Sequence, residues 1–179
     1  MPIYFVRHGE SEANVKGLFA GQRDDSPLTD LGRSQAAGAG AEVMNLNIAR
    51  IYASPLSRAK ETAEIIAHEI GYPVDEIEFD NRILEYDMGS LTGTLRADAE
   101  KNRALLTHDA ENKQAFLDRV TDFLREHADS EANVLLVSHA GVGRMIETAR
   151  IGLPPEEFMQ VEGYPNAHVV KLDLSWVVP

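Results

Sequence analysis

The stretch IYFVRHGES, residues 3–11, decides how this chain folds. Its four leading apolar residues predict a buried strand. Arginine, histidine and glycine follow at once, so the strand ends in reactive polar groups. Open α/β sheets bind ligands outside the carboxyl ends of their strands. We therefore expect Arg7 and His8 to border a ligand site, although the pair also suits the first solvated turn of a loop.

A second stretch, VLLVSHAG at residues 134–141, repeats this pattern. It predicts another buried strand, over 134–137, which again ends in a polar residue, a histidine and a glycine. A helix follows, through residues 144–148. In a parallel sheet, His8 and His139 would face each other across one crevice. We favour a shared site over a chance pair.

The remaining elements alternate between strands and helices, which is typical of an α/β domain. The strands are expected over 48–53, 77–80 and 167–174, and the helices over 29–45, 58–70 and 112–127, the first capped by Thr29. Arg58 falls in the first turn of its helix, where a cation opposes the helix dipole. An anion bound at this helix N-terminus would explain why an arginine stands there, since helix N-termini and arginine both favour phosphate.

Two loops are candidate pocket walls. The segment 16–27 carries glycines and a proline, and the segment 82–93 carries Glu85 directly after two apolar residues. A partly buried carboxyl group at Glu85 could serve as an acid. The lid would come from the loop after Asn14 and from the segment 94–109.

Composition limits the possible functions. The chain has 179 residues, a formal net charge of −12 and no cysteine. We expect one domain over 1–179, and no disulfide or thiol nucleophile. The acidic balance argues against nucleic-acid and membrane partners. Because no signal peptide is visible, we expect a cytoplasmic protein.

The candidate residues suit phosphoryl transfer: Arg7, His8, Arg58, Glu85 and His139. A neutral histidine can attack phosphorus, arginines match phosphoryl oxygens, and a carboxyl group can move the proton. A zinc site from the two histidines and Glu85 ranks low, because adjacent arginines would repel the cation. We interpret His68, His108, His127 and His168 as structural or surface residues.

The motifs resemble those of the histidine phosphatase superfamily, in its phosphoglycerate mutase-like branch. The resemblance begins with RHGES at 7–11 and Asn14. It continues, in the family's order, through Gly21-Gln22, LTDLG at 28–32, SPLSRA at 54–59, Thr62-Ala63, RILE at 82–85, Gly89, Gly93, SHAG at 138–141 and Pro165-Asn166. These motifs span nearly the whole chain.

The resemblance implies a three-layer α/β sandwich with a mostly parallel central sheet and helices on both faces. It implies that His8 is the phosphorylated nucleophile and Glu85 the proton donor. Arg7, Arg58 and His139 would form the phosphate pocket. Asn14 and Gln22 match pocket-lining positions, the latter through its backbone, and Asn166 is tied to orienting the nucleophilic strand. It implies no metal and no organic cofactor.

Within the branch we expect a metal-independent phosphatase that acts on a small phosphorylated metabolite. Mutases that use a bisphosphate primer carry longer insertions, whereas the segment 86–138 is short here and has little basic character near Glu85. Protein phosphohistidine phosphatases typically lack the loop that contains Glu85. A cofactor-dependent phosphoglycerate mutase and a protein phosphohistidine phosphatase remain alternatives, as does a non-catalytic module that binds phosphate ligands. The sequence does not predict the oligomeric state.

Overall fold

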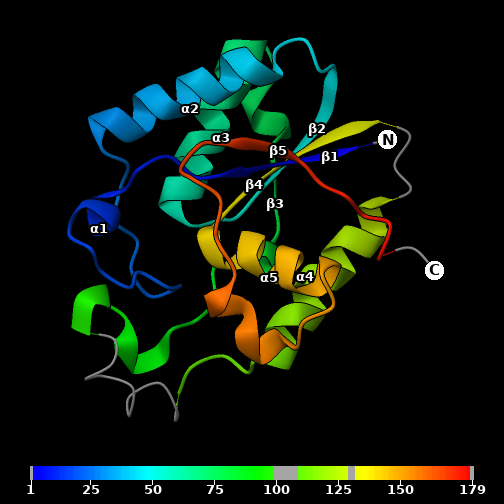
Figure 1. Ribbon diagram of the computed structural model, residues 1–179. Helices are drawn as coiled ribbons and strands as arrows, with labels where there is room; N and C mark the ends of the chain where they lie inside the picture. Colours follow the sequence, from blue (N-terminus) through cyan, green and yellow to red (C-terminus); the bar gives the residue numbers. More distant parts are fainter. Residues whose placement is uncertain (1, 99–108, 129–131, 178–179) are drawn as a thin grey trace.

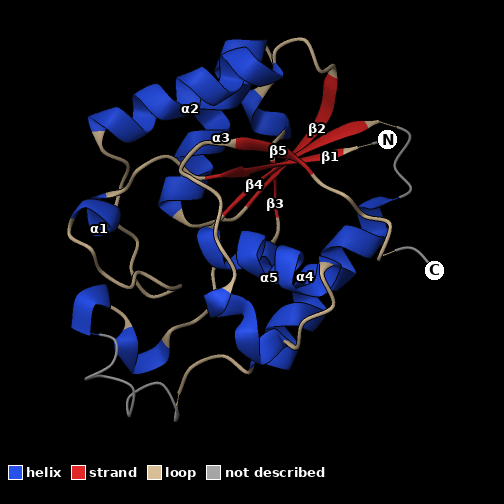
Figure 2. Cartoon of the chain, viewed as in Figure 1, coloured by secondary structure: helices blue, strands red, loops and turns tan. Residues whose placement is uncertain are grey.

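One five-stranded sheet organises the protein (Figures 1 and 2). The computed structural model describes residues 2–98, 109–128 and 132–177. The strands lie in the order β3-β2-β4-β1-β5. Strands β1 to β4 pair in parallel, and β5 runs antiparallel to β1. Their bounds are Ile3–Arg7 (β1), Ile48–Ala53 (β2), Glu78–Phe79 (β3), Asn133–Ser138 (β4) and Val169–Lys171 (β5).

Helices cover both faces of the sheet. Helices α2 and α3 pack together on one face, and α4 and α5 pack together on the other (Figure 1). The α-helices are Glu12–Val15 (α1), Asp30–Val43 (α2), Ser57–Ile70 (α3), Lys113–Ala128 (α4) and Ala140–Arg150 (α5). Short 3-10 helices occupy Val74–Glu76, Asn81–Ile83, Gly89–Leu91, Arg96–Asp98 and Pro155–Gln160. This arrangement confirms the predicted three-layer α/β sandwich.

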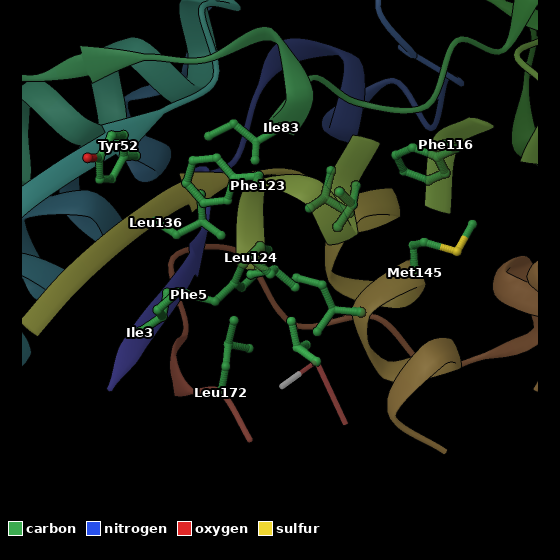
Figure 3. Packing of buried hydrophobic residues seen from close by; sticks show 14 of the residues in the cluster. Ile3, Phe5, Tyr52, Ile83, Phe116, Phe123, Leu124, Leu136, Met145 and Leu172 are labelled. Atoms are coloured by element: carbon green, nitrogen blue, oxygen red, sulfur yellow. The ribbon is translucent and has the colours of Figure 1, made fainter. Parts of the chain in front are cut away.

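The alternation of side chains along the strands produces two cores. Ile3 and Phe5 point to the face that α4 and α5 cover, where they meet Leu136 and Phe123 (Figure 3). Val6 belongs to the opposite core, under α2 and α3. Successive side chains of a strand point to opposite faces, so an uninterrupted apolar run is needed where both faces are covered.

The connections after β1 and β4 determine where a ligand site can form on the sheet. The chain leaves β1 through α2 and joins β2 beyond β4, whereas it leaves β4 through α5 and joins β5 beyond β1. The two neighbouring strands therefore connect toward opposite edges of the sheet. Such a reversal opens a crevice at the carboxyl ends of the strands, where doubly wound sheets bind ligands. His8 and His139 are the residues that directly follow these two strands.

Several predicted boundaries were wrong. The last strand was expected over 167–174, but β5 has three residues. Ala167 adopts a left-handed φ of 51°, which a strand does not accommodate. Helix α2 ends two residues earlier than predicted, and α3 begins one residue earlier. His108 and most of the predicted lid segment 94–109 lie outside the described residues. Among the helices that the structure describes, none is long and apolar enough to cross a membrane.

Candidate active site

His8 is buried at the end of β1, with 3% of its surface exposed. Its Nδ1 lies 2.7 Å from the carbonyl oxygen of Gly9. A carbonyl only accepts, so Nδ1 carries the hydrogen and Nε2 keeps its lone pair. Burial, followed by the charges of Arg58 and Arg7, lowers the pKa of His8 well below its ordinary value. His8 is therefore a neutral imidazole at physiological pH, the form in which it can act as a nucleophile.

Glycines allow the chain after His8 to pass close to α2. A Cβ on Gly9 would lie 2.3 Å from the carbonyl oxygen of Gly32, and one on Gly32 would lie 2.1 Å from that of Glu10. The amide of Gly9 also donates to the hydroxyl of Thr62, at 3.0 Å. These contacts fix the backbone on which His8 sits.

His139 lies beside His8, with 5.3 Å between the ring centroids. The register of β1 and β4 pairs Arg7 with Ser138, and the amide of His8 donates to the Ser138 carbonyl at 2.9 Å. The next residue of each strand is thus a histidine at the same level. Nε2 of His139 lies 2.7 Å from the hydroxyl of Ser54, while its buried Nδ1 has no partner in the described part of the chain. Burial, then Arg58 and His8, lowers the pKa of His139 well below its ordinary value.

Arg58 is 1% exposed, which is unusual for an arginine. Its terminal nitrogens donate to the carbonyls of Asp24, at 2.8 Å, and Gly21, at 2.9 Å. Burial lowers its pKa, and its buried Nε has no partner among the described residues. The predicted place of Arg58, in the first turn of α3 just after β2, is confirmed. Carbonyl groups orient this guanidinium but leave its charge unpaired.

Arg7 ends β1 and donates through a terminal nitrogen to the carbonyl of Tyr164, at 3.0 Å. Burial lowers the pKa of Arg7 to about 10, and the neighbouring arginines act in the same direction. Like Arg58, it forms no salt bridge in the described part of the chain. Two partly desolvated cations next to His8 form an environment suited to an anion.

Glu85 is buried and held by backbone amides. One carboxyl oxygen accepts from the amide of Tyr86, at 2.8 Å, and the other from that of Gly141, at 3.2 Å. A Cβ on Gly141 would lie 2.0 Å from the Glu85 carboxyl, so a glycine is needed there. The carboxyl group thus touches the first turn of α5, directly after His139.

The structure places Gln22 differently from the prediction. It is Gly21, rather than Gln22, that lines the pocket. The Gln22 side-chain amide instead donates to the backbone carbonyl of Glu85, at 2.7 Å, and Arg119 donates to the same carbonyl at 3.0 Å. Gln22 therefore holds the loop that carries the carboxyl group.

Asn14 does line the pocket, and Asn166 connects it to His8. The Asn166 side-chain amide donates to the His8 carbonyl, at 2.8 Å, and to the Asn14 side-chain oxygen, at 3.3 Å. That oxygen also accepts from the Ser11 amide. Since its oxygen is occupied, Asn14 retains its NH₂ group as a donor for a ligand.

Other predicted histidines lie outside the pocket. His68 is exposed on α3, and His168 is exposed just before β5. His127 lies in the last turn of α4, which ends at Ala128, and is buried against the rings of Tyr52 and Phe123. Among the residues described, no group of three or more histidine, aspartate or glutamate side chains is arranged to hold a metal ion.

Two arginines that were not among the predicted site residues, Arg96 and Arg144, also line the pocket. The cavity has a volume of about 150 Å³, and the residues lining it are Arg7, His8, Asn14, Phe19, Ala20, Gly21, Arg58, Glu85, Met88, Arg96, Ala140, Gly141, Arg144, Phe158 and Met159. The segment after Glu85 thus contributes a basic residue, Arg96, contrary to the prediction. Arg144 could have been found, because it follows Ala140 by four positions and so shares a helix face with the start of α5. We call Arg7, His8, Arg58 and His139 the inner group, and Arg96 and Arg144 the outer pair.

This geometry, a neutral histidine beside two arginines without a carboxylate partner in the described part of the chain, is suited to binding an oxyanion. The chain belongs to the histidine phosphatase superfamily (branch 1), whose sequence model matches residues 3–175. The predicted family is confirmed.

Named relatives fall into two groups. The chain is 34% identical to "Probable phosphoglycerate mutase GpmB" of Citrobacter koseri, over all of this chain and 89% of that protein. A mycobacterial glucosyl-3-phosphoglycerate phosphatase, solved in complex with VO3, is 27% identical, with a TM-score of 0.81 over 96% of this chain and 92% of that one. The alpha-ribazole phosphatase of Shigella flexneri is 26% identical, with a TM-score of 0.79 over 97% of this chain and 90% of that one.

Proposed function

We propose that this protein is a metal-independent phosphatase that hydrolyses small phosphate monoesters through a phosphohistidine intermediate on His8. The observation that carries the proposal is a neutral histidine, with its Nε2 lone pair free, beside the buried Arg58 and the half-buried Arg7, which have no salt bridge in the described part of the chain. The phosphatases among the structural relatives support the same reaction class.

In the first step, Nε2 of His8 attacks phosphorus and the bond from phosphorus to the ester oxygen breaks. Glu85 in its protonated form gives its proton to the departing oxygen, so an alcohol leaves. Arg7, Arg58 and His139 bind the three remaining phosphoryl oxygens. The positive charge of the two arginines and the hydrogen-bond donors of all three residues stabilise the charge that develops in the transition state.

In the second step, water attacks phosphorus and the bond from phosphorus to Nε2 breaks. Glu85, now a carboxylate, accepts a proton from that water, which restores the acid for the next cycle. Inorganic phosphate leaves and His8 is neutral again. Its hydrogen on Nδ1 stays bonded to the Gly9 carbonyl throughout, which holds the ring in the attacking orientation.

A phosphate-release assay tests this proposal. Wild type and His8→Ala are compared on para-nitrophenyl phosphate, phosphoglycerates, sugar and nucleoside phosphates and a phosphohistidine peptide, all with a chelator present. Removal of the nucleophile should lower kcat by about 10⁴-fold or more. After incubation with an ester that carries a radiolabelled phosphate, the wild-type enzyme should retain a phosphoryl label. That label should be lost in acid and survive in alkali, as expected for phosphohistidine. Exposed His68→Ala is the control and should keep full activity.

A phosphoglycerate mutase is the second candidate, favoured by the name of the relative that is 34% identical over the whole chain. Interconversion of 2- and 3-phosphoglycerate that depends on the bisphosphate, without phosphate release, would establish it. Preferred turnover of the phosphohistidine peptide would indicate a protein phosphatase. Phosphate binding without turnover of any ester would indicate a binding module.

We further propose that residues 1–179 act as one domain in the cytoplasm. The family model covers 3–175, and helices α2, α3, α4 and α5 cover the faces of a single sheet. Limited proteolysis that released a stable fragment would contradict the first statement. Cell fractionation tests the second.

A further inference from the structure

The segment that carries Glu85 is fixed by side chains and not by a sheet or a helix. In the described structure, residues 84–88 follow a 3-10 helix and belong to no regular element. The backbone carbonyls of such a segment need hydrogen-bond donors from outside the strand and helix ladders. A general acid must also stay within hydrogen-bond reach of the oxygen that it protonates. The side chains that hold this segment therefore bear on the reaction.

Arg119 supplies most of these donors. It lies on α4, and 18% of its side chain is exposed. One terminal nitrogen donates to the carbonyls of Arg82, at 2.6 Å, and Leu84, at 2.7 Å, and the other donates to that of Glu85, at 3.0 Å. Nε and the second terminal nitrogen donate to the Glu111 carboxylate, at 2.6 and 2.9 Å. All five N–H groups of the guanidinium thus have an acceptor.

Glu111 holds the same segment further along. Its carboxylate accepts from the amide of Asp87, at 3.2 Å, and its own amide donates to the Asp87 carbonyl, at 3.0 Å. The Tyr86 hydroxyl donates to the Glu111 carbonyl, at 2.6 Å. Because Glu111 balances the charge of Arg119, the segment receives hydrogen bonds from a neutral ion pair. We call Arg119 and Glu111 the clamp.

The clamp belongs to a continuous set of contacts. The Ser138 hydroxyl donates to the Ile83 carbonyl, at 2.8 Å, so every carbonyl from residue 82 to residue 85 accepts from a side chain. The Arg119 guanidinium lies over the buried ring of Phe116, at 4.5 Å from the centroid, which fixes its plane. Neither clamp residue is among the described residues that line the pocket, so the clamp acts through the segment and not on a ligand.

We propose that the clamp positions the Glu85 carboxyl for proton transfer, and that this position depends most on Arg119. The inference rests on the proposed function, in which Glu85 gives its proton to the departing oxygen. With its carbonyl fixed by Arg119, Glu85 reaches the amides of Tyr86 and Gly141 with its carboxyl oxygens. Arg119 is a positioning residue, because it acts through Glu85.

Two esters with different leaving groups test the proposal. The alcohol of an alkyl phosphate that wild type hydrolyses, such as glycerol 3-phosphate, leaves poorly unless it is protonated, whereas the phenolate of para-nitrophenyl phosphate leaves with little help from an acid. In Arg119→Met, kcat/KM should fall by about 10-fold to 100-fold for the alkyl ester and by less than about threefold for the aryl ester. The ratio of the two values is independent of the folded fraction of the enzyme. Equal losses for the two esters would overturn the proposal.

Arg82→Met is the matched control. The Arg82 side chain also lies over a ring, that of Phe123, at 5.4 Å from the centroid. Its donors go to the carboxylates of Asp80 and Glu126 instead of to the backbone of the segment. The ratio of kcat/KM values should therefore stay as in wild type, even where stability falls. A change as large as that in Arg119→Met would contradict the assignment.

Two further variants show whether Arg119 acts through Glu85. Arg119→Lys keeps a charge beside Glu111 but lacks the planar fork and has fewer donors. The ratio should fall less than in Arg119→Met, and this variant decides the question if Arg119→Met does not fold. In Glu85→Gln the acid is gone, so adding Arg119→Met should not lower kcat/KM for the alkyl ester further. Additive losses would overturn the proposal.

A measurement without substrate separates the clamp from the reaction. The amides of Tyr86 and Gly141 donate to the Glu85 carboxyl, so their hydrogen exchange reports whether that carboxyl stays in place. By NMR, both should exchange about tenfold or more faster in Arg119→Met, relative to the amides of β4, and at the wild-type rate in Arg82→Met. Faster exchange in a protein that hydrolyses no ester would refute the phosphatase and support the clamp. Turnover with unchanged exchange and an unchanged ester ratio would do the reverse.

Discussion

Arg7, His8 and Arg58 of the inner group line the same pocket as the outer pair, but the two sets are built differently. His8 and His139 directly follow two paired strands, and Arg58 lies in the first turn of the helix that follows a third strand, β2. Arg96, in contrast, lies in a short 3-10 helix tied to another loop, and Arg144 lies one turn into α5. The inner residues lie at or just after the ends of strands, whereas Arg96 is tied to the Leu18 carbonyl and Arg144 packs against the loop at Gly163. We infer that the sheet sets the reaction and the loops select the substrate.

The largest effect that would separate the two groups comes from Arg58→Lys. Lysine keeps the charge but cannot donate to the Gly21 and Asp24 carbonyls and to a phosphoryl oxygen at once. We expect kcat/KM to fall by about 10²-fold to 10³-fold for every ester tested. Arg33→Lys is the control, because Arg33 is an exposed arginine paired with Glu61. A loss restricted to some of the esters would show that Arg58 selects the substrate instead.

A smaller effect is expected from Gly141→Ala, which pushes the Glu85 carboxyl away from α5. The new Cβ would lie 2.0 Å from a carboxyl oxygen. We expect kcat to fall by about 10-fold to 100-fold, and the free energy of unfolding to fall by about 1–3 kcal/mol. Steady-state kinetics and urea denaturation measure the two quantities.

Gly38→Ala provides the matched comparison. Gly38 is also helical, but nothing lies within 4 Å of its added Cβ. Here kcat should be unchanged, and the protein should gain about 0.5–1 kcal/mol from the better helix propensity of alanine. If both variants behaved alike, the contact between Gly141 and Glu85 would have no role in catalysis.

Ser54→Ala tests how His139 is oriented within the inner group. The Ser54 hydroxyl accepts from the Leu56 amide, which favours donating its own hydrogen to Nε2 of His139. The neutral ring then presents Nδ1–H as a donor. We expect kcat to fall by about tenfold, with Ser54→Thr restoring activity because it retains the hydroxyl. A pH profile of kcat identical in all three proteins, at unchanged kcat, would show that Ser54 does not orient His139.

The smallest effect concerns pH. Protonated His8 cannot attack, so kcat is lost as the pH falls through the pKa of His8. Because that pKa lies well below its ordinary value of 6.5, activity should persist below pH 6.5. Arg7→Gln removes one of the charges that lower this pKa, so the acid limb of the kcat profile should move to higher pH, by less than about one unit. A shift to lower pH would contradict the electrostatic account.

The free energy of unfolding should also depend on pH through His8 and His139. Below pH 6.5 the unfolded chain protonates His8 and His139, while the folded protein keeps both neutral. The free energy of unfolding should therefore decrease as the pH falls below 6.5, until the folded pKa values are reached. His8→Asn should reduce that dependence, as measured by urea denaturation at several pH values.

The sequence by itself determined the parts of this protein that depend on local pattern. Two apolar runs that each end in a histidine predicted β1, β4 and the pairing of His8 with His139, because a parallel sheet aligns the carboxyl ends of its strands. Arg58 and the helix that contains it could be predicted from local pattern as well. The last strand could not, since its first predicted residues depend on the left-handed turn at Ala167.

Only the tertiary structure decided which loop residues reach the pocket. Arg96 reaches the pocket because Leu95 pairs with Leu18. The Gln22 side-chain amide donates to the Glu85 carbonyl, at 2.7 Å, a contact that the folded loops bring about. Such contacts join segments far apart in the sequence and carry no periodic signal. The strand ends are dictated by local hydrophobic pattern, whereas the loop contacts form only after the sheet and its helices have packed.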